Sequence, residues 1–189
     1  RAKEPKAVAA FIRAHKNKVL FYKWLQWQLF EQFRSVKAYA AKCGVLLMGD
    51  MPFLVSRDSA DVWAHQEYFR LDLSSGAPSD LYFAQGQRWG MPPYDWKKIA
   101  EDDFEYVRRK MKCAEALFDL YRIDHFVGMF RLWTIALSEP MEHAGMHGVF
   151  DPQDDRLWKS HGQRILDVML ESAKMLPCAE DLGVVPKCS

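Results

Sequence analysis

The chain has 189 residues, of which 49% are hydrophobic, so it is long enough to bury the core of one ordinary domain. Its 26 basic residues nearly balance its 25 acidic residues, and both kinds are spread along the chain. This pattern excludes a basic nucleic-acid-binding face and a polybasic membrane patch, and no apolar run reaches the ~18 residues of a membrane span. We therefore expect a cytoplasmic protein with a small or uncharged partner, although a plastid or another compartment is not excluded.

Residues 18–43 form the first predicted helix. Their apolar side chains recur at spacings of four and three without an internal Gly or Pro, which is typical of an amphipathic helix. These positions are Leu25, Leu29, Phe33, Val36 and Ala40. Gly44 ends the helix, and the apolar run over residues 45–48 predicts a strand buried on both faces.

The order of helix followed by strand recurs twice. Residues 101–120 have helical spacing and lead into "LYRID", and residues 157–175 lead into "LPCAEDLG". Three such units predict a parallel sheet, and the long irregular segments 51–98 and 127–156 both follow a strand, where (β/α)8 barrels build their active sites. We therefore predict an α/β fold in which residues 1–189 are a central fragment of a TIM barrel, with about three of the eight units and no second domain.

Each predicted strand ends in an acid: Asp50, Asp124 and Glu180. Parallel strands deliver their C-terminal ends to one rim, so these carboxylates should converge. Arg122 lies two positions before Asp124, which places both on the same face of a strand and lets the cation keep that aspartate ionised. Converging carboxylates suit glycosidic-bond chemistry, whereas helix capping or ion pairing alone is the structural alternative.

Other candidate residues carry weaker signals. His125 points away from Asp124 on a regular strand, so it either bonds a backbone carbonyl or contacts a sugar hydroxyl. The loop containing "GQRWGMPPYDW" holds several rings, including Trp89 and Tyr94, which either stack on sugars or pin the loop. His143 and His147 have metal-ligand spacing, but no third ligand lies nearby in the sequence, so no metal site is predicted.

The strings "GDMPFLVSRDSADVWAHQEYF", "GAPSDLYFAQGQRWGMPPYDW", "YRIDHFVGMFRLW" and "AEDLGVVP" resemble, in order, the signature blocks of the 4-α-glucanotransferases of the α-amylase clan. The resemblance implies a (β/α)8 barrel that transfers α-1,4-glucan segments with retention, through a covalent glucosyl-enzyme and without a cofactor. It implies that Asp124 is the nucleophile and Glu180 the general acid/base. Substrate contacts are expected at Asp50, Arg122, His125, Trp89 and Tyr94, with maltooligosaccharides or α-glucans as partners.

Two departures from the family pattern stand out. Met91 occupies a position where the family usually has Asn, and the family's third catalytic aspartate has no counterpart in this chain. The chain begins without Met, so we expect a fragment, and because it lacks the third aspartate and the remaining strands of the barrel we expect it to be inactive alone. A non-catalytic glucan-binding or structural remnant and a retaining α-glucan hydrolase remain alternatives, and the oligomeric state is not determined.

Overall fold

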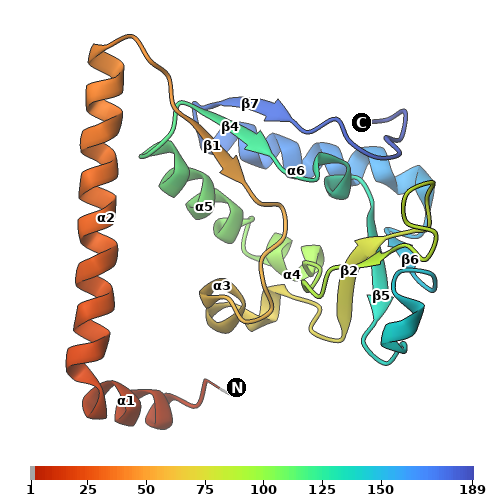
Figure 1. The fold of residues 1–189 in the computed structure, drawn as a ribbon, viewed down its shortest axis with the longest axis horizontal. Helices are drawn as coiled ribbons and strands as arrows, with labels where there is room; N and C mark the ends of the chain where they lie inside the picture. The colour runs from red at the N-terminus through yellow and green to blue at the C-terminus, as the bar shows by residue number, and fades with distance from the viewer. Residues whose placement is uncertain (1–2) are drawn as a thin grey trace.

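A three-stranded parallel sheet organises the computed structural model, which describes residues 3–189 (Figure 1). Its strands are β1 (Met48–Met51), β4 (Leu120–Ile123) and β7 (Leu176–Ala179), in the order β1-β4-β7. Both pairings are parallel, as the recurring helix-to-strand order predicts. The C-terminal ends of the three strands therefore lie at one edge of the sheet.

Two helices cover one side of this sheet (Figure 1). They are α5 (Glu105–Glu115) and α6 (Trp158–Ser172), which follow the predicted helical spacing and pack against each other. The helix predicted from residue 101 is divided, because Asp103 and Phe104 adopt positive φ angles of 57° and 60° between α4 (Trp96–Glu101) and α5. The Phe104 ring is buried in the core, which holds the chain at this break.

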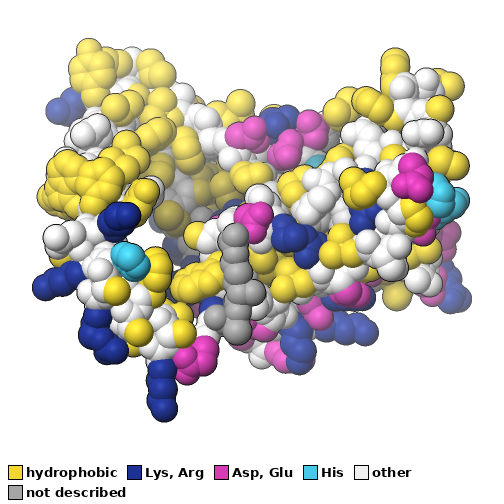
Figure 2. Space-filling model, turned by 60° about the horizontal axis from the view of Figure 1, so that its bottom comes forward, with side chains coloured by type: hydrophobic (Ala, Val, Ile, Leu, Met, Phe, Trp, Pro, Cys, Tyr) yellow, Lys and Arg dark blue, Asp and Glu magenta, His cyan; other side chains and the backbone are white. Residues whose placement is uncertain are grey.

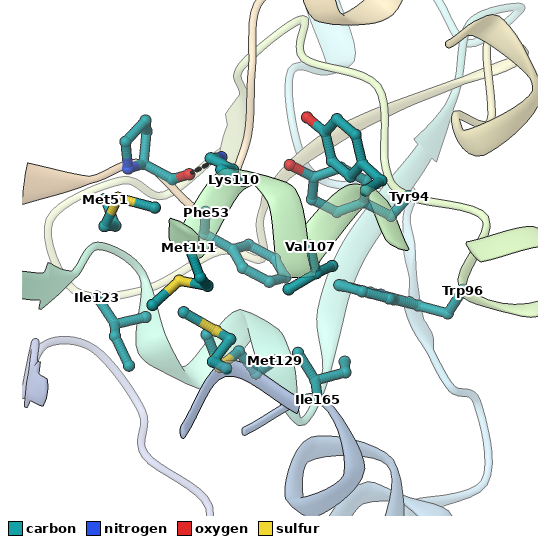
Figure 3. A pocket seen from close by; sticks show the side chains of 13 residues that line it. Met51, Phe53, Tyr94, Trp96, Val107, Lys110, Met111, Ile123, Met129 and Ile165 are labelled. Carbon is teal, nitrogen blue, oxygen red and sulfur yellow. Dashed lines mark hydrogen bonds between the residues drawn. The ribbon is translucent and has the colours of Figure 1, made fainter. Parts of the chain in front are cut away.

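The core fills the space beneath the strands. Figure 3 shows side chains from the strands, from α5 and from the segment after β4 pointing toward one another around a small apolar cavity of about 40 Å³. Among them are Met51, Phe53, Met111, Ile123 and Met129. Because Tyr121 and Ile123 point into this core, the alternation of a strand directs Arg122 and Asp124 to the other face.

A second sheet occupies the two long segments that appear irregular in the sequence. It is antiparallel, with the order β3-β2-β5-β6, and it lies beside the first sheet in Figure 1. Its strands are β2 (Leu73–Ala77), β3 (Gln87–Arg88), β5 (Leu132–Ala136) and β6 (Val149–Asp151). Short helical segments complete these loops: α3 (Ala60–Ala64), η1 (Gln66–Tyr68), η2 (Phe126–Met129), η3 (Met141–His143) and η4 (Asp155–Leu157).

The N-terminal region differs from the predicted amphipathic packing. The helix exists, as α1 (Pro5–Ala14) and α2 (Lys16–Lys42), but α2 stands apart from the sheets in Figure 1 and Ala40 is its one buried residue. Leu29, Phe33 and Val36 are exposed, and Figure 2 shows hydrophobic side chains gathered on this side of the molecule. The apolar stripe is therefore not covered by residues 3–189.

The strand predicted at residues 45–48 is wrong in both place and burial. Val45 and Leu46 are exposed and precede β1, which begins at Met48 and alternates between exposed and buried residues. The apolar run begins in the connection from α2 instead, where the Val45 N–H donates to the Ala40 carbonyl and closes the C-terminal end of the helix. None of the described helices combines the length and apolarity that a membrane crossing requires.

We predict that the central strand is sensitive to truncation of its core side. Ile123 is 2% exposed, so Ile123→Ala should lower the free energy of unfolding of the complete protein by about 2–5 kcal/mol, from lost burial and the cavity left behind. Urea denaturation checks this, with Leu81→Ala as the control because Leu81 is 100% exposed. Equal effects of the two substitutions would contradict the packing described for β4.

Candidate active site

One guanidinium gathers the three acids that follow the parallel strands. Arg122 donates from Nε and Nη2 to the two oxygens of Asp50, at 3.0 and 2.8 Å. Its Nη2 also donates to Oδ1 of Asp124 at 2.9 Å, and its Nη1 donates to Oε1 of Glu180 at 2.9 Å. The predicted convergence of the three carboxylates is therefore present.

The register of the sheet explains why these side chains meet. Asp50 is the direct partner of Arg122 across the β1–β4 pair, so their side chains leave the sheet on the same face. Asp124 follows β4 immediately, and its N–H bonds the Met51 carbonyl at 3.2 Å. Glu180 follows β7 immediately, and its N–H bonds the Ile123 carbonyl at 3.2 Å. The site is thus built on backbone pairing, which fixes it more firmly than a free loop would.

The three carboxylates differ in how many of their oxygens are engaged. Both oxygens of Asp50 accept from Arg122, and the oxygens of Glu180 accept from Arg122 and from the His125 N–H. Asp124 accepts from Arg122 through Oδ1 alone, and among residues 3–189 its Oδ2 accepts no hydrogen bond. Its side chain is 42% exposed. The Asp124 carboxylate therefore has one oxygen free to react with an incoming molecule.

His125 positions Glu180 through its backbone, a role that sequence reasoning missed. The residue adopts a left-handed φ of 50°, and its N–H donates to Oε2 of Glu180 at 2.8 Å. Its ring packs edge-on against Trp89 with the ring centroids 4.9 Å apart, and because the residue lies outside β4 in a left-handed conformation, the alternation of a strand does not set the direction of the ring. Burial lowers the pKa of the imidazole below 6.5, so the ring is neutral at neutral pH. Strand periodicity carries no signal for this backbone contact.

The two predicted aromatic contacts have different surroundings. Trp89 is partly buried, and its indole N–H donates to Gln87 at 3.0 Å, so the ring is held beside His125. Tyr94 is only 5% exposed and packs against Phe53 and Phe69 in the core. Its ring pins the loop, which was the alternative to sugar stacking, so Tyr94 does not offer a ring face to a ligand in this structure.

The charges of the cluster are strongly coupled. Arg122 lowers the pKa of Asp50 below its ordinary 3.8, chiefly through their hydrogen bonds, and the carboxylates raise the pKa of Arg122 in return. One guanidinium therefore donates hydrogen bonds to three carboxyl groups, and the neutral ring of His125 adds no charge.

We predict that Arg122→Gln destabilises the complete protein in a pH-dependent way. Because the pKa of Asp50 is lowered, its stabilising contribution is present above pH 3.8 and is lost as the pH falls through the lowered value. The variant should therefore be less stable than the parent at pH 7, and the difference should shrink below about pH 4 as Asp50 takes up a proton. Urea denaturation at both pH values checks this, with the exposed α5 residue Arg109→Gln as a control. A deficit of the same size at both pH values would contradict the ion-pair arrangement.

The comparisons with known proteins agree among themselves. The profile of the 4-alpha-glucanotransferase family matches residues 1–189. The chain is 40% identical over 171 residues to a 4-alpha-glucanotransferase of Chlamydia pneumoniae, covering 90% of this chain and 31% of that protein. It is 36% identical over 192 residues to a 4-alpha-glucanotransferase of Thermus thermophilus, covering 98% of this chain and 36% of that protein. The chain thus spans about a third of the length of these relatives.

Solved structures give the same result. An amylomaltase from Streptococcus agalactiae, determined in complex with acarbose, superimposes with a TM-score of 0.85 at 28% identity. The match covers 98% of this chain and 37% of that chain. From the family profile, the sequence relatives and this structural likeness, the chain belongs to the 4-alpha-glucanotransferase family.

Proposed function

We propose that the complete protein transfers α-1,4-glucan segments between maltooligosaccharides or glucans, and that Asp124 is its nucleophile. The observation that carries the assignment is the free Oδ2 of Asp124, since the oxygens of Asp50 and Glu180 are both engaged. A carboxylate that a cation holds through one oxygen, and whose other oxygen is open, suits attack at an anomeric carbon. The names of the relatives and the acarbose complex of the structural neighbour support the choice of α-glucans.

In this proposal the reaction is a double displacement. Asp124 attacks the anomeric carbon and forms a glycosyl ester, while Glu180 protonates the departing sugar oxygen. The hydroxyl of an acceptor glucan then attacks the ester and gives its proton to Glu180, and the carboxylate of Asp124 leaves. The two steps return both acids to their starting states, and the configuration at the anomeric carbon is retained.

Glu180 and Arg122 have distinct roles here. Each oxygen of Glu180 accepts one N–H donor in the structure, from Arg122 and from the His125 backbone, and these contacts orient the carboxyl group while each oxygen keeps a second lone pair for the proton. Arg122 keeps Asp124 oriented for attack, and the bidentate contact with Asp50 holds the guanidinium itself in place. Asp50, His125 and Trp89 then line the sugar site in the proposal, while the buried ring of Tyr94 supports the loop from beneath.

We further propose that residues 1–189 form a central part of a (β/α)8 barrel. In support, β1, β4 and β7 are parallel neighbours in chain order, with α5 and α6 as crossovers between them. Within residues 3–189, β1 and β7 each pair on one side only, and the apolar stripe of α2 is exposed. Further strands and helices of a barrel would cover these surfaces.

We predict that Asp124→Asn lowers transfer by about 10³-fold or more in the complete protein, because an amide cannot form the glycosyl ester. The measurement is the conversion of maltotriose into glucose and longer maltooligosaccharides. Asp155→Asn, which makes the same change outside the site, is the matched control and should retain full activity. More than about a tenth of the parental activity in Asp124→Asn would overturn the assignment.

The same product analysis separates the alternatives. A hydrolase would yield glucose and maltose without longer products, because water rather than a sugar would attack the same intermediate. A non-catalytic glucan-binding protein would leave maltotriose intact.

A further inference from the structure

A second cluster of chemically active side chains lies in the loop of residues 137–148, between β5 and β6. Oε1 of Glu139 is 2.5 Å from Nδ1 of His143 and 2.5 Å from Nδ1 of His147. The ligand-type atoms of the three residues all lie within 4.8 Å of one another. The sequence pattern offered no third ligand beside the two histidines, and the fold of the loop supplies it in Glu139.

From this juxtaposition, we propose that Glu139, His143 and His147 form a binding site for a divalent transition-metal ion of the Zn²⁺ type. Two imidazole nitrogens and one carboxylate oxygen are typical ligands of such ions. They are not typical of Mg²⁺ or Ca²⁺, which take oxygen ligands. Three protein ligands leave a fourth tetrahedral position for water. The proposal does not depend on the glucan-transfer function.

The distances in the cluster fit such a site after a small movement. With metal–ligand bonds of about 2.0–2.1 Å, two ligands of a tetrahedral ion lie about 3.3 Å apart. Each histidine must therefore withdraw from Glu139 by less than about 1 Å, and ligand atoms that are now up to 4.8 Å apart must approach by about 1.5 Å. The proton on each Nδ1 moves to Nε2 or to solvent, so that the nitrogen can bind the ion. The side chains of His143 and His147 are 39% and 55% exposed, which leaves them room to move and gives an ion access from solvent.

The backbone beneath the cluster is already held in place. Arg88 donates from Nη1 to the Glu139 carbonyl at 2.7 Å, and the Trp133 indole donates to the Gly145 carbonyl at 2.9 Å. The Gly145 N–H bonds the Gln85 carbonyl at 2.9 Å. A Cβ atom at Gly145 would lie 2.4 Å from two backbone atoms, so glycine is what permits this close approach. The loop is thus preorganised, and an ion needs to order side chains only.

The charge of the cluster also suits a cation. Hydrogen bonds from His143 and His147 lower the pKa of Glu139, so the ligand is ionised at neutral pH. On the right of Figure 2, the side on which β5 and β6 lie in Figure 1, histidine and acidic side chains are visible together at the surface. An ion bound there would join three points of the loop 137–148. Arg88 of β3 already holds the start of this loop through hydrogen bonds to backbone carbonyls.

The test uses the complete protein, stripped with a chelator and titrated calorimetrically with Zn²⁺ at about pH 7.5. We expect one saturable site that is lost, or weakened at least about tenfold, in His147→Gln and in Glu139→Gln. His15→Gln, a matched change at an exposed histidine of the N-terminal helices, should leave binding unaltered. Zn²⁺ should raise the melting temperature of the parent and of His15→Gln, but not of the two cluster variants.

Protonation supplies an independent readout. Imidazole binds a metal ion in its neutral form, so the affinity should fall as the solution is made acidic. Substituting Co²⁺ should give the visible absorption of a low-symmetry site in the parent, with no such band in His147→Gln. The proposal would be overturned if no saturable binding were found up to about 100 µM Zn²⁺, or if the parent and His147→Gln bound Zn²⁺ equally. The three residues would then be a hydrogen-bonded cluster only.

Discussion

The candidate active site depends on the planar guanidinium of Arg122 and the three carboxylates around it. Its fork of N–H groups is rigid and always charged, so it can fix several oxygens in one plane, which a lysine ammonium could not do. The carboxylates come from three different strands, and without a shared cation their mutual repulsion would push the strand ends apart. The contact that organises the chemistry therefore also holds the rim of the sheet together.

This arrangement uses the two faces of a single strand for different purposes. Tyr121 and Ile123 anchor β4 in the apolar core, and Arg122 and Asp124 stand on the opposite face between them. The charged side chains can stay at the surface and still be held in position, because the packed side chains on the other face of β4 keep the strand rigid. In the proposed reaction, the placement of Arg122 and Asp124 thus depends on core side chains on the other face of the strand.

The sequence predicts the order of the parallel strands and the meeting of the acids, because strand direction and the two-residue period of a strand are local properties. It does not predict the second sheet, since β2 and β3 are short and contain Ser, Gly and polar residues, which have no alternating apolar pattern. The apolar stripe of α2 predicts that this face of the helix is buried, but it does not identify the element that packs against it, and residues 3–189 leave most of the stripe exposed. Glu139 precedes His143 by the same four residues that separate His143 from His147, but Pro140 and Gly145 argue against the regular helix that this spacing would need, so the sequence alone does not show that the three side chains meet.

The central claim, that Asp124 forms the glycosyl ester, is tested most directly by trapping the ester. In Glu180→Gln, a donor such as α-glucosyl fluoride needs no acid to release its leaving group, whereas the second step lacks its base and is slow. Peptide mass spectrometry of the quenched complete protein should then find one glucosyl group on the peptide that contains Asp124. A glucosyl group on a different residue, or no adduct while fluoride is released in a rapid burst, would contradict the claim.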